Sequence, residues 1–419
     1  MTRSGFRRHA TCDAVSPENS QPPMDPRESP GTTQRVIGSW RGNDPGPTLV
    51  CIAAIHGNEP AGVSALERVF AVIEEREPRL GGEFVGIAGN LQAFARDQRY
   101  LAVDLNRHWL PENIQRARNG DAGPLVSEDV EMRELLEELE RVFSRARGEV
   151  YFLDLHSSSA AGDPFVCIGD TLRNRRFAER FFVPVILGLE EQIDGSLLEC
   201  VSNLGHITMG VEAGQHRAPS SIDHHEAFIW LALVNSGMIA AADVPELETS
   251  RATLRNASHH LRGFVEVRHR HPIVPGDEFR MGEGFTNFQK IAAGQVLAHD
   301  RRGEVHASES GCILLPLYQG LGSDGFFIAR EINMFFLRLS AGLRWLGLDK
   351  IVHWLPGVRR HPQRDAALII DTTLARWFAL EVFHLLGYRK RRSEDGKLVV
   401  SRRRFDHRRP VALIRPRVS

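Results

Sequence analysis

The stretch VCIAAIHGNEPAG, from Val50 to Gly62, decides how the rest of the sequence is interpreted. It begins as an apolar run typical of a buried strand. It continues into a turn that carries His56 and Glu59, three residues apart, before a predicted helix. A histidine and a glutamate at the exit of a core strand are either ordinary loop residues or ligands that the strand holds in place. Further polar groups elsewhere in the sequence distinguish these two interpretations.

The composition is that of an ordinary globular protein. The chain has 419 residues, of which 42% are hydrophobic and 25% charged, with a net charge of −1. Two or three domains are therefore expected, and neither nucleic acid nor a membrane is predicted as a partner. The five cysteines form no CxxC pair, which favours free thiols in a reducing compartment. No stretch reaches the ~18 apolar residues of a membrane span. A cytoplasmic protein is expected, and it could form homo-oligomers.

The sequence changes character three times along its length. Residues 1–34 are rich in Pro, Ser, Arg and Thr and are predicted to be a disordered tail. Between 35 and 254, apolar runs alternate with helical patterns, which predicts an α/β domain with a mixed sheet flanked by helices; the runs are TLVCIAAI, GEFVGIAG, EVYFLDLH, DPFVCIG and ITMGVEAG. Residues 255–333 alternate with frequent glycines and predict a smaller β-rich domain. Residues 334–419 predict a C-terminal α/β extension of unassigned role.

Polar groups follow four of the predicted strands. Because ligands bind beyond the carboxyl ends of strands in open α/β sheets, these groups are expected to share one crevice. In chain order they are His56 and Glu59, then Arg99, Asp104, Asn106 and Arg107, then His156, then Glu212. Two histidines and a carboxylate make a catalytic zinc site with the fourth position left to water. A further glutamate can take a proton, a guanidinium can stabilise an oxyanion, and an Asn-Arg pair suits a carboxylate.

Each of these residues also has a purely structural interpretation. His156 could be a buried core histidine, Glu212 could form a structural salt bridge, and Arg107 could be an ion-pair partner of Asp104. Four further histidines near a predicted helix start are expected at solvated positions: His206, His216, His224 and His225. The basic segment from Arg389 to Arg417 lacks the aromatic residues of a nucleic-acid platform and is expected to be a solvated face or an edge hairpin.

The segments HGNEPAG, RYLAVDLNR, DLHSSS and GVEAG resemble, in this order, the four motifs of the succinylglutamate desuccinylase/aspartoacylase family. This family is a branch of the zinc carboxypeptidase-like fold, and the resemblance covers about residues 35–335. It implies one Zn²⁺ per chain, held by His56, Glu59 and His156.

The same resemblance assigns roles to the remaining groups. It implies that Glu212 is the general base, that Arg99 polarises the scissile carbonyl, and that Asp104 orients His56. It further implies that Asn106 and Arg107 hold the carboxylate of the substrate. The expected enzyme is a zinc-dependent amidohydrolase that cleaves C–N bonds other than peptide bonds, here the amide of a small N-acyl amino acid.

The sequence departs from the family at two places. The stretch LLECVSNLG lacks the arginine and tyrosine that aspartoacylases carry shortly before the glutamate matching Glu212, and DLHSSS replaces the usual Asn-Thr pair after the histidine. A substrate less acidic than N-acetylaspartate is therefore expected. In the second domain Tyr318 is the tyrosine expected to reach inward. Two alternatives remain open: a zinc carboxypeptidase acting on peptides, and a non-catalytic binding protein that keeps the fold.

Overall fold

The computed structural model describes residues 34–119, 125–258, 263–364, 366–371, 380–394, 397–403 and 405–406. These residues form a mixed 11-stranded sheet with the order β1-β3-β2-β4-β7-β5-β6-β8-β14-β13-β10. Strands β3, β2, β4 and β7 run parallel, whereas β5 is antiparallel to β7 and β8, β14, β13 and β10 form an antiparallel half. The predicted mixed sheet flanked by helices is confirmed.

The strands of the main sheet have the following bounds: β1 Val36–Arg41, β2 Asp44–Ala53, β3 Gly81–Ala88, β4 Val150–Ser158, β5 Phe165–Ile168, β6 Val185–Leu187, β7 Ile207–Gln215, β8 Phe264–Pro272, β10 Lys290–Ile291, β13 Gly311–Leu314 and β14 Asp324–Glu331. All five apolar runs singled out in the sequence contain strands, namely β2, β3, β4, β5 and β7. They could be recognised because strands covered on both faces are apolar nearly throughout.

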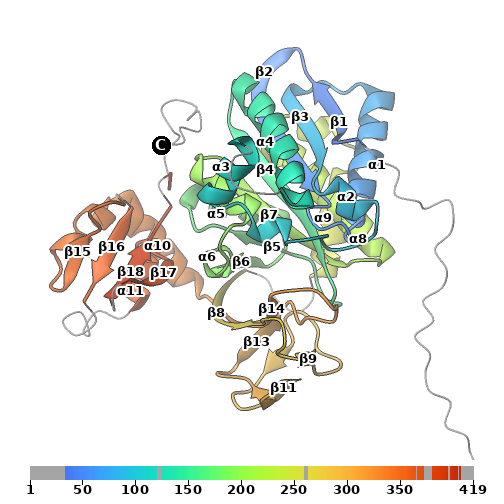
Figure 1. Ribbon diagram of the computed structural model, residues 1–419. Helices are drawn as coiled ribbons and strands as arrows, with labels where there is room; N and C mark the ends of the chain where they lie inside the picture. The colour runs from blue at the N-terminus through green and yellow to red at the C-terminus, as the bar shows by residue number, and fades with distance from the viewer. Residues whose placement is uncertain are drawn as a thin grey trace, which may run out of the picture. The chain divides into compact units, whose positions relative to one another are not determined.

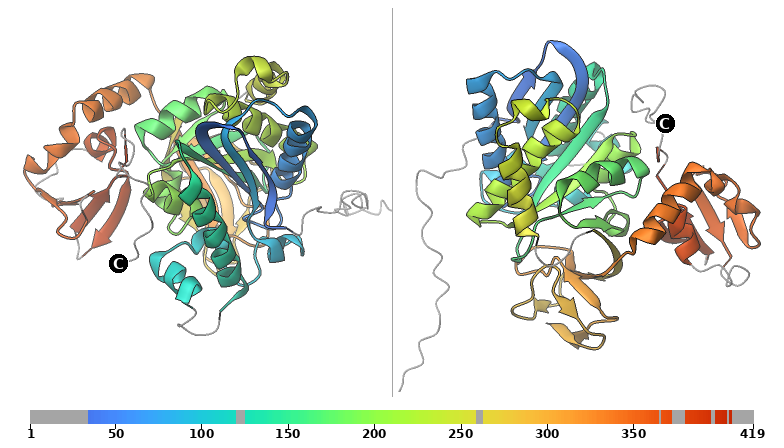
Figure 2. Two further views of the ribbon diagram at one scale, coloured as in Figure 1. Left: turned by 90° about the horizontal axis from the view of Figure 1, so that it is seen from above. Right: turned by 180° about the vertical axis from the view of Figure 1, so that it is seen from behind.

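Helices cover both faces of the sheet. One core contains side chains of α1 and α8, and the other contains side chains of α4 and α7. Figure 1 shows α4 on the near face, and the rear view in Figure 2 shows α8 and α9 on the other. The helices of this part are α1 Ala61–Arg76, α2 Leu91–Phe94, η2 Leu105–Arg107, α3 Pro111–Asn119, α4 Ser127–Arg145, α5 Leu172–Ala178, η3 Glu179–Phe181, α6 Leu189–Gln192, α7 Leu197–Asn203, α8 Pro219–Asn235, η4 Ala241–Asp243 and α9 Leu247–Ala257.

The segment predicted as a β-rich domain contributes to two sheets. Strands β8, β14, β13 and β10 continue the main sheet, and a 3-stranded sheet with the order β12-β11-β9 packs beside them over a core that includes Leu297 and Phe326. The bounds are β9 Arg280–Met281, β11 Val296–Asp300 and β12 Gly303–His306. The domain boundaries drawn from the sequence stay predictions, and the expected tail lies outside the described residues except for Gln34.

The C-terminal extension has its own sheet and core. Its elements are α10 Met334–Trp345, η5 Leu348–Lys350, η6 Val352–Trp354, β15 Val358–Arg360, β16 Ala367–Ile370, α11 Leu380–Leu385, β17 Lys390–Glu394 and β18 Lys397–Ser401. The strand order is β15-β16-β18-β17, and β17 pairs with β18 as the hairpin expected from RRSEDGKLVVSRRR. Asp170, beside β5, receives ion pairs from Arg175 and from Arg344 and Arg389 of the extension. The extension is thus tied to the main sheet by buried charges.

Candidate metal centre and its pocket

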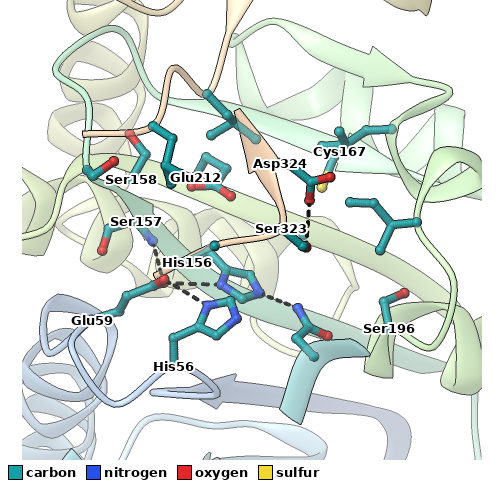
Figure 3. A pocket seen from close by; sticks show the side chains of 18 of the residues that line it. His56, Glu59, His156, Ser157, Ser158, Cys167, Ser196, Glu212, Ser323 and Asp324 are labelled. Carbon is teal, nitrogen blue, oxygen red and sulfur yellow. Dashed lines mark hydrogen bonds and ion pairs between the residues drawn. The ribbon is translucent and has the colours of Figure 1, made fainter. Parts of the chain in front are cut away.

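Three side chains from two strand ends meet beyond the sheet (Figure 3). Glu59 Oε1 lies 2.8 Å from His56 Nδ1, and Glu59 Oε2 lies 3.1 Å from His156 Nδ1. All three residues are buried, and one donor atom of each lies within 4.8 Å of the others. Two imidazole nitrogens and one carboxylate are the donor set of many catalytic zinc sites. These residues therefore fit a zinc ion.

The local backbone explains why His56 and Glu59 leave the strand at this place. Ala54, directly after β2, has a left-handed φ of 52°, which is unfavourable for a residue with a Cβ and turns the chain sharply. Gly57 lies so close to α2 that a Cβ there would come within 2.2 Å of the Ala93 carbonyl carbon. The turn thus holds both side chains against the end of β4 at the cost of some backbone strain.

Each histidine has a carboxylate behind it. His56 Nε2 lies 3.1 Å from Asp104 Oδ1, as the family resemblance implied, and His156 Nε2 lies 3.0 Å from Asp154 Oδ2. Such partners orient an imidazole so that its other nitrogen faces the metal. Asp154 was missed in the sequence, although residues two apart in a strand share a face and DLH therefore places Asp154 beside His156.

The charges of the group depend on one another. Burial by itself would raise the pKa of Glu59, but His56 and His156 hold it well below its usual range. Burial would likewise lower the pKa of His156, yet Asp154 and Glu59 raise it well above its usual range. Without a metal His156 therefore retains a proton, and a cation that binds here must displace this proton.

Glu212 lies beside the triad because of the strand register. Strands β4 and β7 pair in parallel with His156 opposite Glu212, so both side chains emerge on the same face of neighbouring strands. Glu212 Oε2 is buried and forms no hydrogen bond with any described residue. Burial raises the pKa of Glu212 to about 8, with the Glu59 carboxylate adding to the rise and His156 and Arg99 opposing it. A carboxylate held this way is a good proton acceptor.

The two predicted arginines both reach the pocket but differ in their partners. Arg99 lies 3.2 Å from Asp104 and 3.6 Å from Glu59, so it faces the triad. Arg107 does not pair with Asp104; its Nη2 lies 2.8 Å from Asp324 Oδ2, at the start of β14. The alternative that Arg107 is an ion-pair partner of Asp104 is therefore wrong, because Asp104 is taken by Arg99 and His56.

Asn106 supports the site rather than facing open space. Its amide nitrogen lies 3.1 Å from His156 Nε2, and its Oδ1 accepts a hydrogen bond from the Leu197 amide at the start of α7. Both ends of this side chain are thus engaged by the protein. Of the predicted Asn-Arg pair, only Arg107 presents an exchangeable partner to a substrate.

A loop from the β-rich segment covers the pocket. The cavity holds about 940 Å³ of empty space including its mouth, and its lining comprises the triad and Glu212 together with residues 315–317, 319 and 322–324 of the loop between β13 and β14. The loop is held by Gln319, which accepts a hydrogen bond from Asn58 at 3.0 Å, and by Tyr318, whose amide donates to Ser159 Oγ at 3.1 Å. We call residues 315–324 the roof loop.

Three expectations about single residues were wrong. Tyr318 turns away from the pocket, because its hydroxyl donates to the Gly282 carbonyl within the β-rich segment. His216 lines the pocket instead of facing open solvent, with Nδ1 2.8 Å from Ser157 Oγ and Nε2 3.3 Å from Gln319. His225 is buried on the inner side of helix α8, and burial lowers its pKa to about 3.

Comparison with known proteins agrees with this geometry. Residues 45–229 match the sequence model of the succinylglutamate desuccinylase/aspartoacylase catalytic domain. A succinylglutamate desuccinylase from Pseudomonas fluorescens (strain SBW25) is 30% identical over 115 residues, which cover 27% of this chain and about a third, 32%, of that protein.

Solved structures share the fold. A succinylglutamate desuccinylase/aspartoacylase from Rhodobacter sphaeroides is 16% identical, with a TM-score of 0.51 over 70% of this chain and 88% of the other. A succinylglutamate desuccinylase from Chromobacterium violaceum is 15% identical, with a TM-score of 0.50 over 73% of this chain and 97% of the other. Residues 45–229 thus match the catalytic domain of the succinylglutamate desuccinylase/aspartoacylase family, and the chain shares the fold of the solved structures.

Proposed function

We propose that this protein is a zinc-dependent hydrolase that cleaves the amide bond of a small N-acyl amino acid. The observation that carries the proposal is the convergence of His56, Glu59 and His156 on one point, with the Glu212 carboxylate next to them. A non-catalytic binding protein would have no chemical need for a carboxylate whose Oε2 is buried without a hydrogen bond beside a complete metal-binding set. The match of residues 45–229 to the catalytic domain of a deacylase family supports the same conclusion.

Different residues of the site are proposed to carry out different parts of the reaction. Zinc bound by the triad would polarise the substrate carbonyl and lower the pKa of a water molecule. Glu212 takes a proton from this water as its oxygen attacks the carbonyl carbon, and then delivers the proton to the amine nitrogen as the C–N bond breaks. Arg99, next to the triad, stabilises the negative charge that develops on the carbonyl oxygen.

The substrate carboxylate is the natural partner of Arg107. Because Asp324 already pairs with Arg107, an incoming carboxylate must take the place of Asp324, which keeps Arg270 as a second partner. The other guanidinium of the pocket lining, Arg99, already faces Glu59 and Asp104. A second acidic group on the substrate therefore lacks a cation among the described pocket residues, which supports a substrate with one carboxylate.

The roof loop favours a small substrate over a peptide. Residues of this loop line the cavity opposite the triad, and hydrogen bonds from Asn58 and to Ser159 hold the loop in place. A peptide substrate of a carboxypeptidase continues beyond the acyl group of the scissile bond, and this additional chain would have to displace these contacts. We therefore rank the carboxypeptidase alternative below the deacylase.

The test combines metal analysis with a substrate panel. Purified protein should hold about one zinc per chain and should hydrolyse N-acyl amino acids, but not the same compounds with the carboxylate converted to an amide. Equal turnover of acid and amide would contradict the role of Arg107. Zinc-free protein that hydrolyses the panel at the same rate would contradict the metal assignment.

A further inference from the structure

Helix α10, Met334–Trp345, buries two polar side chains and exposes several large apolar ones. Its buried residues are Leu337, Ser340 and Arg344, of which two are polar, and Leu343 is half-buried against the core of the extension. Its outward stripe contains Phe335, Leu339 and Leu346, spaced four and then seven residues apart. A surface helix normally buries the apolar stripe and exposes the polar one, so the orientation of α10 requires an explanation.

The inward polar contacts fix this orientation. Ser340 Oγ donates to the Leu385 carbonyl at 2.7 Å, and Arg344 pairs with Asp170 of the main sheet and with Asp406. Turning the helix over would leave the buried Asp170 and Asp406 without this guanidinium, which is costly. The apolar stripe therefore stays outside for as long as these ion pairs exist.

The exposed apolar surface continues past the end of the helix. Phe335 is 64% exposed, Trp345 74% and Trp354 75%, and Phe336, Leu346 and Ile351 are also exposed. Single exposed apolar residues are normal, but so many within 21 residues mark a surface that is covered in use. We call residues 334–354 the apolar segment.

The charges around this segment are of one sign. Between residues 332 and 360 the sequence has five Lys or Arg residues and a single acidic residue, Asp349, which is buried against Arg402. Arg338, Lys350 and Arg359 are exposed and form no ion pair with any carboxylate of the described residues. An anionic partner therefore fits, whereas a second copy of the segment, placed against the first, would oppose like charges.

We propose that the apolar segment binds the surface of an anionic lipid bilayer, with the Phe and Trp side chains in the interface and Arg338, Lys350 and Arg359 at the head groups. Aromatic residues combined with basic ones are characteristic of helices that lie in the plane of a membrane. None of the described helices has the length and hydropathy to cross a bilayer, so the contact is peripheral. This proposal is independent of the enzymatic one, and it replaces the sequence-based expectation of no membrane partner.

The test is co-sedimentation of the full chain with lipid vesicles. Vesicles of phosphatidylcholine with about one third phosphatidylglycerol should bind the protein at low salt, and vesicles of phosphatidylcholine alone should bind it at least about tenfold more weakly. The double variant Phe335→Ser/Trp345→Ser should lose at least about tenfold in binding, because outward side chains carry the contact. Val274→Ser, a change of an equally exposed apolar residue in the β-rich segment, is the matched control and should bind like wild type.

Tryptophan fluorescence locates the contact without depending on weakened binding. Of the six tryptophans in the sequence, Trp109 and Trp230 are buried and Trp345 and Trp354 are exposed. The part of a blue shift on addition of vesicles that replacement of Trp345 and Trp354 removes is therefore assigned to these two side chains. The variant Trp345→Phe/Trp354→Phe keeps the apolar surface and should still bind while losing most of this shift. Absence of binding at low salt, equal binding to both vesicle types, or unchanged binding of Phe335→Ser/Trp345→Ser would overturn the proposal. A dimer that Phe335→Ser/Trp345→Ser dissociates, without vesicle binding, would show instead that a second copy covers the segment.

Discussion

The strand ends of β2, β4 and β7 and the roof loop line the same cavity, but they are held in place by different forces. His156 and Glu212 are fixed by the hydrogen-bonded register of two core strands, and the His56 turn packs against buried backbone. The roof loop is held by a few side-chain contacts, such as Asn58 to Gln319 and Arg107 to Asp324. The groups proposed to perform the chemistry therefore lie at the ends of core strands, whereas Asp324, which competes with a substrate carboxylate for Arg107, lies on the roof loop.

The largest effect is expected from His156→Ala, which removes a ligand on the rigid side. Two remaining ligands should not retain zinc, so metal content should fall from about one per chain to near zero, and activity with it. Metal analysis after dialysis measures this. A His156→Ala variant that still holds one tight zinc per chain would show that the metal lies elsewhere.

Glu212→Gln should remove catalysis without removing the metal. The amide keeps the shape of the side chain but cannot take a proton, so kcat should fall by roughly 10²–10⁴-fold. Zinc content should equal that of wild type, since Glu212 is proposed as a base and not as a ligand. Loss of zinc in parallel with activity would place Glu212 among the ligands.

Asp154→Asn tests the carboxylate behind His156. An amide holds the imidazole less well than a carboxylate, so zinc affinity should drop by about 10–100-fold in competition with a chelator. Asp104→Asn, behind His56, is the matched variant and should behave alike. If only Asp104→Asn weakens zinc binding, the contact between Asp154 and His156 has no supporting role.

Glu266→Gln tests the attachment of the extension and leaves the chemistry untouched. Burial opposes ionisation of Glu266, but His384 and Arg389 lower its pKa to about 2. Because the pKa is depressed in the folded state, its contribution is present above about pH 4.5 and is lost as the pH falls towards 2. Wild type should lose about 2 kcal/mol more unfolding free energy than Glu266→Gln over this range, measured by urea unfolding. Identical pH profiles would contradict this role.

The smallest effect is expected from Asp324→Asn on the roof loop. Without its charge, Asp324 competes less for Arg107, so KM for a free-acid substrate should fall by roughly fivefold while kcat stays constant. Asp300→Asn is the control, since Asp300 pairs with the exposed Arg302 away from the pocket. A change in kcat at constant KM would mean that the roof loop affects the chemical step. The proposed division of roles between the strand ends and the roof loop would then be wrong.

The same contrast explains what could be predicted from the sequence. The strands, and the polar groups that follow them, are local patterns, so His56, Glu59, His156 and Glu212 could be assembled from the positions of strand ends. The roof loop could not, because its place depends on the pairing of β14 with β8, and among the described strands β8 joins the rest of the main sheet only through its pairing with β6. The prediction that Tyr318 points into the pocket was wrong for this reason, because the direction of a side chain in a loop leaves no periodic pattern in the sequence.

The burial of certain polar side chains could not be predicted from the sequence either. His225 was expected in solvent because histidines near a helix start usually are, but it lies on the buried side of α8, while Asp223 of the same helix is exposed. Arg344 and Asp170 belong to an ion-pair cluster in which directly paired residues are up to 219 residues apart, from Asp170 to Arg389. Pairing over such a distance has no sequence signature, so the buried attachment of the extension could only be seen in three dimensions.

The position of the roof loop in the chain has a consequence for how the site is made. A ribosome releases residues in order, and His56, Glu59, His156 and Glu212 all emerge more than a hundred residues before Leu315. During synthesis the metal-binding set is thus complete while nothing yet covers it. We expect newly made protein to take up zinc through this open entrance, and the finished protein to exchange it more slowly.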